Sequence, residues 1–526
     1  MGEAHFWMPD ASRERLEKTW PQVFRTEVLK MIPEAAFAIL YSATMGRPNF
    51  SVVILVALSI LKEMLDLTDE ALMDSFRFDL RFHHALGLTL EETDLSIRTL
   101  YNFRERVVGT PAVVETFNHV AGQIIEKLGL KTGKQRIDSS HICSNMATLT
   151  RLGLFVRTIE GFMTELGEVS PERCEGLPKP FKDRYGDRPG HFADARSSQC
   201  RRRLDMVAKD LWKLVNRFRG DEVVTQLRSY KLLERLLKEQ CNVGFGDEGE
   251  PGGEETVTVK PGKEVAGDSL QNPSDPDATY DGHKGQGYQV QIVETCDKDN
   301  PIQVITHMVV EQAHVSDHGA TIPAIDALEA RDHTPEKLFG DTAYSSGQNL
   351  VEAAERGVEL MAPTPGKIDP DGINLGHFEL DLATLTVVAC PEGKHPVVDE
   401  LDKDGKTHHL RFDREDCKTC PAVLDCPAGK QNGRLDVHPH DVALAYSRVR
   451  EESEGFKTEY KIRGGIESTN AECKKAHSMG KAWCRGLPKM TFATVMKLTA
   501  CNVKRFMRHQ CAQFLEKEVK MVPIAA

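Results

Sequence analysis

Four residues near the C-terminus combine the types and the spacing that chemistry on phosphates requires. They are Tyr460, Arg463, Glu467 and Lys474, in the segment EYKIRGGIESTNAECKK. On a helix, which turns about 100° per residue, this spacing places the four side chains within about 60° of one another. A carboxylate can hold a metal ion, and cations beside it can hold phosphate oxygens. The segment therefore predicts a helix face on which one carboxylate lies between two cations.

Paired glycines, Gly464 and Gly465, interrupt this segment. They weaken the first turn of a helix, because glycine loses more backbone freedom on folding than any other residue. Glu467 and Lys474 are therefore expected on the helix itself. Tyr460 and Arg463 are expected either on the helix or on a loop just before it.

Two aspartates far away in the sequence are candidates to join Glu467. Asp138 lies within a strand candidate at 135–142 (QRIDSSHI), and Asp341 lies near the end of a short strand in KLFGDTAY. Three carboxylates gathered by the fold could bind two divalent ions about 4 Å apart, which would activate a nucleophile and stabilise a leaving oxygen. Mg²⁺, or Mn²⁺ in its place, suits such oxygen ligands, whereas the carboxylates would repel one another without a metal.

The elements that must position these residues alternate between helix and strand. Residues 30–125 have helical periodicity, and Thr68 followed by two acids predicts the start of a second helix there. The runs YQVQIVETC and PIQVITHMVV, on either side of DKDN, predict a hairpin. Helical patterns cover 155–240 and about 316–330 and 346–356. The residues alone thus predict a mixed α/β protein.

The Y-x2-R-x3-E-x6-K spacing resembles the signature around the third acidic residue in one large branch of bacterial insertion-sequence transposases, the DDE enzymes. GDTAY resembles the second acidic motif of that family, and DPDATYDGHKGQGYQVQ resembles the segment before its second strand. In that segment His283 and Lys284 are expected either to approach the active site or to form a solvated turn. The run from Gly46 to Leu88 resembles the family's N-terminal helical domain, which is thought to contact the element's ends.

The resemblance implies an α/β fold with a ribonuclease-H-like mixed sheet, a helical N-terminal domain and two insertions, one helical and one containing cysteines. The boundaries that follow are a helical DNA-binding domain at 1–125 and a ribonuclease-H-like catalytic domain at 130–510. Within the second domain we expect a helical insertion at 150–243, an acidic flexible linker at 244–282 and a Cys-rich insertion at 365–450.

The function that the resemblance implies is DNA transposition: metal-dependent cleavage at element ends, then attack of a 3′-hydroxyl on target DNA. The partners would be double-stranded DNA and a second copy of the chain. Two alternatives stay open, a domesticated non-catalytic DNA-binding protein and a metal-dependent nuclease on the same fold. The catalytic and Mg²⁺-binding residues would be Asp138, Asp341 and Glu467, and the DNA-binding residues Tyr460, Arg463, Lys474 and Lys475.

Four cysteines between Asp341 and Glu467 have the spacing C-x26-C-x2-C-x5-C. The C-x2-C pair can form a thiolate knuckle for tetrahedral Zn²⁺, and a loop-rich insertion would gain stability from such a structural ion. Reduced, half-buried thiols are the alternative. The cysteines are Cys390, Cys417, Cys420 and Cys426, and the possible substitutes for Cys390 are His395, His408 and His409.

Charge is strongly segregated along the 526 residues, although the net charge is −12. Residues 456–510 carry twelve Lys and Arg against three Glu, and residues 201–240 carry eleven against six acids. Residues 244–282 carry ten acids against two lysines. The two basic segments fit DNA, although the second is equally compatible with an ordinary solvated helix face.

The cellular setting is predicted from the cysteines and the apolar runs. Thirteen cysteines without a recognisable secretion signal favour reduced thiols in a bacterial cytoplasm, where a transposase would associate with the nucleoid. The longest apolar run, Val52 to Leu61, is too short to span a bilayer. No membrane partner is therefore expected.

Overall fold

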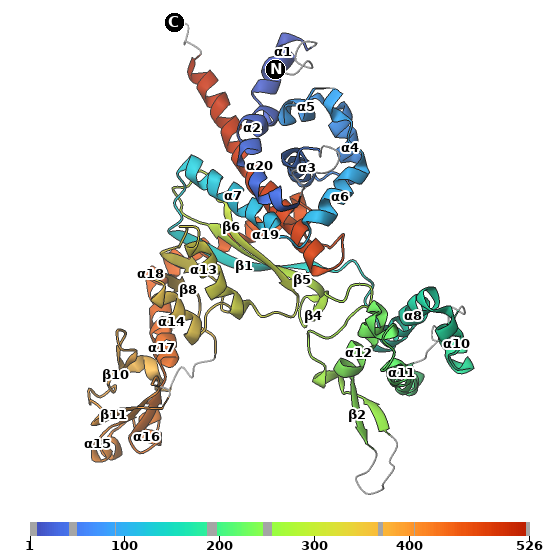
Figure 1. Cartoon of the computed structure of the whole chain (residues 1–526). Coiled ribbons are helices and arrows are strands. Elements are labelled where there is room, and N and C mark those ends of the chain that lie inside the picture. The colour runs from blue at the N-terminus through green and yellow to red at the C-terminus, as the bar shows by residue number, and fades with distance from the viewer. Residues whose placement is uncertain are drawn as a thin grey trace.

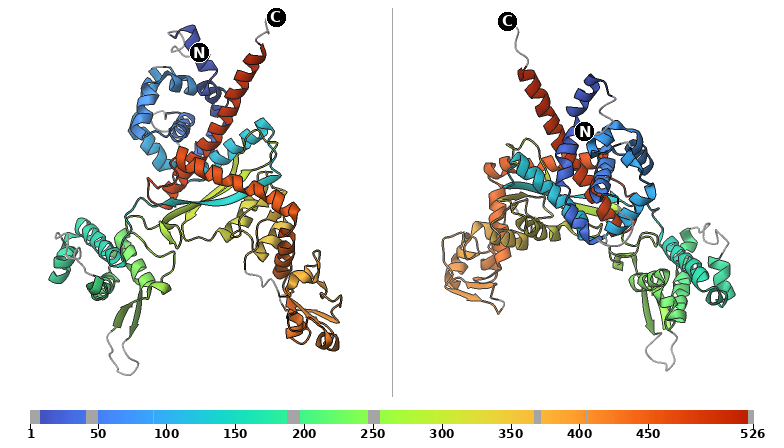
Figure 2. Two further views of the ribbon diagram at one scale, coloured as in Figure 1. Left: turned by 180° about the vertical axis from the view of Figure 1, so that it is seen from behind. Right: turned by 45° about the horizontal axis from the view of Figure 1, so that its top comes forward.

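The computed structural model describes residues 8–40, 50–89, 91–186, 197–245, 255–366, 372–403 and 405–521. A mixed sheet lies at the centre, and the N-terminal helices lie on one side of it together with the long C-terminal helix (Figure 1). Two arms extend away from the sheet in all three views (Figures 1 and 2). The expected mixed α/β class is confirmed. No described helix has the length and apolar character needed to cross a membrane.

The N-terminal part is helical, as predicted. Helix α3, the apolar run of the sequence, is buried on almost every side, and α20 packs against both α3 and α7. Thr68 caps α4 by accepting a hydrogen bond from the backbone N–H of Ala71, which confirms the second helix start. The helices are α1 Asp10–Glu17, α2 Trp20–Thr26, α3 Val52–Leu65, α4 Asp69–Phe78, α5 Leu80–Leu86, α6 Ile97–Val107, α7 Pro111–Leu128 and α20 Leu487–Met521.

Strand β1 is central in the sheet. It pairs antiparallel with β5 and parallel with β7, which in turn pairs parallel with β8. On the side away from β1, β5 pairs antiparallel with two strands. The first residues of β5 pair with β4, and the rest pair with β6. The strands are β1 Lys134–Cys143, β4 Thr279–Asp281, β5 Gly285–Thr295, β6 Ile305–Gln312, β7 Lys337–Phe339 and β8 Glu359–Met361. The predicted first strand and hairpin are both present.

Two apolar cores cover the two faces of this sheet. One joins Ile142, Tyr288 and Ile292 to α7, α20 and the N-terminal helices. The other joins Ile137 and Val293 to α13, Thr321–Glu329, and α14, Gly347–Glu355. Neighbouring residues of one strand point to opposite faces, so β1 and β5 are buried on both sides.

The helical insertion follows β1 and packs around its own core, which includes Phe155, Phe162 and Tyr230. After the last helix of this insertion, the chain forms an antiparallel hairpin of β2 and β3. The elements are α8 Arg151–Val169, α9 Pro171–Glu175, α10 Lys179–Tyr185, α11 Ser197–Phe218, α12 Arg228–Gln240, β2 Cys241–Phe245 and β3 Glu255–Val259.

The expectation of a flexible linker at 244–282 is wrong for 255–282. The alternating ETVTV forms β3, and the residues after it are packed: Leu270 is buried in the core of the helical insertion, and Asp275 is fully buried beside β5. Asp275 accepts a hydrogen bond of 2.6 Å from the Tyr288 hydroxyl. Asp275, which the acidic composition of the segment suggested to be a solvated linker residue, is therefore a buried hydrogen-bond acceptor. Residues 246–254 lie outside the described ranges.

The cysteine-containing insertion follows β8 and forms the second arm. Its core contains Phe378, Leu410 and Phe412. A hairpin of β9 and β10 and a sheet of β11, β12 and β13 surround it. The elements are β9 Glu379–Asp381, β10 Thr386–Ala389, β11 Val398–Leu401, β12 His408–Arg411, α15 Arg414–Thr419, α16 Pro427–Lys430, β13 Arg434–Val437 and α17 Pro439–Glu451.

The segment that carries the Y-R-E-K spacing is helical throughout but changes type at the glycines. Tyr460 ends α18, Glu454–Tyr460, and Arg463 lies in a 3-10 turn, Lys461–Gly465. Glu467 lies in the first turn of α19, Ile466–Ala476. A Cβ atom on Gly465 would lie 1.9 Å from Nη1 of Arg136, whereas one on Gly464 would meet nothing within 4 Å. Gly465 thus lets α19 approach β1 closely.

We predict that Gly465→Ala destabilises the fold by about 1–3 kcal/mol, the usual cost of overpacking a filled site. Arg136 cannot move aside freely, because Glu294 and the backbone oxygen of Ile462 hold its guanidinium. Gly464→Ala is the matched control and should leave stability unchanged or slightly raised. Thermal unfolding of the two variants measures this, and equal midpoints would contradict it.

Candidate active site

One guanidinium joins the three predicted carboxylates. Arg463 Nη2 lies 3.1 Å from Oδ1 of Asp138 and 3.6 Å from Oδ2 of Asp341, and Nη1 lies 2.9 Å from Oε1 of Glu467. Asp138 comes from the middle of β1, Asp341 from the loop just after β7, and Glu467 from α19. The fold therefore gathers three acids that are far apart in the sequence around a single positive charge.

The three carboxylates differ in their exposure to solvent. The side chain of Asp138 is 12% exposed, whereas those of Asp341 and Glu467 are 41% and 63% exposed. Burial raises the pKa of Asp138 to about 6; Arg463 opposes this rise, and the charges of Glu467 and Asp341 add to it. Burial alone would lower the pKa of Arg463, but the surrounding acids outweigh it and raise that pKa. The site thus strongly favours a bound cation.

Asn470 is a further contact of Asp138 that sequence reasoning missed. Its Nδ2 donates to Oδ2 of Asp138 over 2.9 Å. Asn470 lies three residues after Glu467, so both side chains lie on the same side of α19. This spacing was the signal available in the sequence. With Arg463 on one oxygen and Asn470 on the other, the Asp138 carboxylate has a fixed orientation.

A second buried acid, Glu294 on β5, attaches α19 to the sheet and was also missed. Glu294 is fully buried and pairs with Arg136 at 2.6 Å and Arg505 at 3.2 Å. Its other donor is the Thr469 hydroxyl on α19, at 2.7 Å. Because a buried charge requires such partners, this cluster fixes where α19 lies against the sheet.

Tyr460 supports the loop that carries Asp341. Its hydroxyl donates to the backbone oxygen of Gly340 over 2.9 Å, and its ring stacks on Phe456 with centroids 5.4 Å apart. Burial raises the pKa of Tyr460. Its hydroxyl proton is thus engaged with the backbone next to Asp341.

The two lysines at the end of α19 are exposed. Lys475 lines a cavity of about 1010 Å³ between the first helices and α20, together with Lys504 and Arg508. Lys284 Nζ lies 3.4 Å from Oγ of Ser139, the residue after Asp138 on β1. The backbone N–H groups of His283 and Lys284 both bond to Asp281, which makes the local structure a turn. Lys475 thus lies toward the N-terminal helices, and Lys284 lies beside β1.

The four cysteines of the second insertion line one cavity of about 240 Å³. Burial raises the pKa of Cys417, and the neighbouring Cys426, Cys390 and Cys420 raise it further. The three histidines weighed as substitutes bond elsewhere: His395 with the Val388 backbone oxygen, His408 with Asp399 and His409 with Asp436. The arrangement thus favours Cys390 over a histidine as the fourth member, and an all-sulfur donor set suits zinc.

Two segments of the chain match models of known protein families. Residues 389–507, which include Glu467, match the family described as Transposase DDE domain. Residues 14–106, which span α1 to α6 within the N-terminal helices, match the family described as Transposase domain (DUF772). Searches of the curated proteins and of the solved structures found no match. Both matched families are transposase families, and together they indicate an insertion-sequence DDE transposase.

Proposed function

We propose that this transposase cleaves DNA at the ends of its element in a metal-dependent reaction and then joins the exposed 3′-hydroxyl to target DNA. The observation that carries the proposal is the contact of Arg463 with Asp138, Asp341 and Glu467 at once. Three carboxylates around one cation form a site of the kind that phosphoryl transfer on nucleic acid uses.

The strand arrangement supports a ribonuclease-H-like catalytic domain. The order β6, β5, β1, β7, β8 has two antiparallel pairings followed by two parallel ones. In this order Asp138 lies on the central strand, and Asp341 follows the strand beside it. The Glu467 helix then packs on β1 through Arg136, which bonds to the Ile462 backbone just before that helix.

The donor set suits Mg²⁺ or Mn²⁺. Asp138, Asp341 and Glu467 would hold the ion through oxygen atoms alone, which hard divalent cations prefer. When bound, the metal would activate the attacking oxygen and stabilise the leaving one. Asn470 orients the Asp138 carboxylate, and Tyr460 positions the loop of Asp341.

Arg463 neutralises the acids, and its planar guanidinium also suits a DNA phosphate. Lys474 and Lys475 add positive charge at the far end of α19, within the basic segment 456–510. The N-terminal helices meet this segment at the cavity that Lys475 lines. We propose that this region binds the double-stranded element ends, and that two copies of the chain act together as a homodimer on paired ends in the cytoplasm, on nucleoid DNA.

The test is incubation of purified protein with Mg²⁺ and labelled DNA that carries the flanking inverted repeats. Asp341→Ala should lower the cleavage rate by at least about a hundredfold, equivalent to ~2.7 kcal/mol of transition-state stabilisation. The matched control is Glu355→Ala, an exposed acid on α14, which should cleave normally.

The products separate the possible functions. Joined DNA products support transposition, and site-specific nicks without joining support the nuclease alternative. Binding without cleavage in either Mg²⁺ or Mn²⁺ would leave the domesticated DNA-binding protein and would contradict the proposal.

The raised pKa of Asp138 predicts a pH-dependent stability in the metal-free protein. Its folded pKa of about 6 exceeds the unfolded value of about 3.9, so the fold loses stability as pH rises from about 4 to about 6. Asp138→Asn removes this loss. The free energy of unfolding of the variant, relative to wild type, should be larger at pH 7.5 than at pH 5 by about 1 kcal/mol.

Unfolding in the presence of a chelator at these two pH values measures the difference. Asp341→Asn, at the more exposed position, controls for the removal of one negative charge beside Arg463. If the difference in unfolding free energy between Asp138→Asn and wild type does not change with pH, the raised pKa of Asp138 is contradicted.

We also propose that Cys390, Cys417, Cys420 and Cys426 hold a structural Zn²⁺. The Cys417→Ser/Cys420→Ser variant should lose about one zinc per chain and become sensitive to proteases within 365–450, because a small loop-rich unit depends on its metal. Cys174→Ser in the helical insertion is the control. Unchanged zinc content by elemental analysis would disprove the site.

A further inference from the structure

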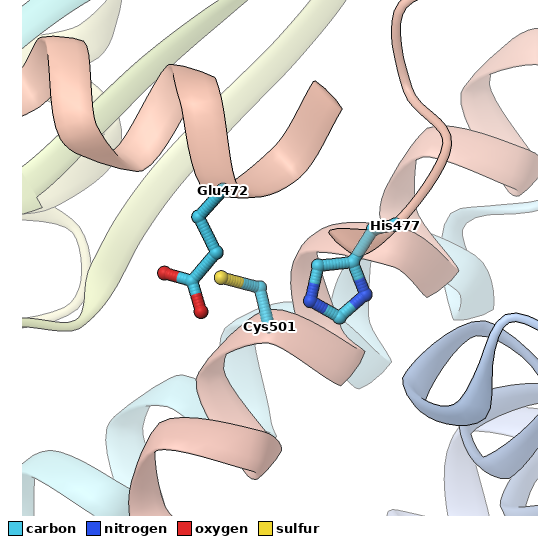
Figure 3. A group of neighbouring side chains, drawn as sticks. All are labelled: Glu472, His477 and Cys501. Atoms are coloured by element: carbon cyan, nitrogen blue, oxygen red, sulfur yellow. The ribbon is translucent and has the colours of Figure 1, made fainter. Parts of the chain in front are cut away.

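A second group of metal-ligating side chains lies at the end of the helix that carries Glu467. One carboxylate oxygen of Glu472, one ring nitrogen of His477 and Sγ of Cys501 all lie within 4.8 Å of one another (Figure 3). Among the residues that the structure describes, no other three His, Cys, Asp or Glu side chains converge so closely. His477 and Cys501 are fully buried. None of the three belongs to the proposed catalytic site.

The surroundings of His477 prepare its ring for a metal. Its Nδ1 lies 2.9 Å from the backbone oxygen of Glu63 on α3, and a carbonyl oxygen can only accept. Nδ1 therefore carries the proton, and Nε2 has a free lone pair. This buried Nε2 has no hydrogen-bond partner among the described residues. Metal-bound histidines characteristically donate their other ring N–H to a carbonyl or carboxylate, as His477 does.

Glu472 and Cys501 supply the remaining donors. Oε2 of Glu472 accepts from Arg505 at 2.8 Å, whereas Oε1 lies 3.8 Å from Arg508, beyond hydrogen-bond distance. That second oxygen can therefore take another ligand.

We propose that Glu472, His477 and Cys501 bind Zn²⁺. A thiolate, an imidazole and a carboxylate are the ligands that zinc takes in proteins. One thiolate and one carboxylate would also neutralise the two charges of the ion, which suits a buried site. The donor set differs from the oxygen-only set of the proposed catalytic site, so the two sites select different metals.

The zinc would join three parts of the chain. Glu472 lies on α19, five residues after Glu467, and Cys501 lies on α20. His477 follows α19 directly and contacts α3 of the N-terminal helices. A neighbouring buried ion pair, Lys497 with Glu63, links α20 to α3 at 2.7 Å. The ion would thus fix the Glu467 helix relative to the N-terminal helices.

The test uses the full chain with Cys417→Ser/Cys420→Ser as background, so that the cysteine-rich insertion does not contribute. Purified background protein should retain about one zinc per chain. Replacement with Co²⁺ should give a sulfur-to-cobalt charge-transfer band. Both signals should disappear with Cys501→Ser or His477→Gln and persist with Cys511→Ala, a half-buried cysteine on the same helix.

Two outcomes would overturn the proposal. One is a folded background protein, by circular dichroism, that binds neither Zn²⁺ nor Co²⁺. The other is a charge-transfer band that survives Cys501→Ser. If Cys501→Ser does not fold, the Co²⁺ affinity of Glu472→Gln is measured instead. Weaker Co²⁺ binding by this variant is expected, and unchanged binding would contradict the site. None of these readouts depends on DNA cleavage, so the inference can fail or hold independently of the proposed function.

Discussion

The mutual repulsion of three carboxylates is the constraint on which the proposed site depends. Asp138, Asp341 and Glu467 can share one small volume only if a cation lies among them, and Arg463 supplies it. The buried Asp138 pays the largest desolvation cost, which is why its pKa rises to about 6. The same repulsion that a guanidinium offsets in the metal-free protein is what gives such a cluster its affinity for divalent ions.

The position of α19 rests on a separate set of charges. Glu294 has no exposure to solvent and is held by Arg136, Arg505 and Thr469. Removing one of these partners would leave a buried charge uncompensated. Gly465 lets α19 lie directly against Arg136, where any side chain would clash. The glycine that weakens the helix in isolation is therefore needed for its contact with the sheet.

The sequence predicts the parts of the fold whose residues have strong local patterns. The apolar helix α3, the hairpin of β5 and β6 and the strand of Asp138 all have such patterns. Composition misled at 255–282, because buried acids such as Asp275 look like solvated ones until their partner is known. Asn470 lies three residues after Glu467, a spacing that could have indicated it, whereas Glu294 and the group of Glu472, His477 and Cys501 depend on contacts between distant segments. Single-residue patterns carry no information about such contacts.

We propose that Asp138, Asp341 and Glu467 exchange Arg463 for a divalent ion when DNA is bound. A crystal structure of the chain with element-end DNA and Mn²⁺ tests this directly, because anomalous scattering locates manganese. The expected result is a manganese peak among Asp138, Asp341 and Glu467, with Arg463 moved to a phosphate. Arg463 still bridging all three acids, with no anomalous peak between them, would contradict the account.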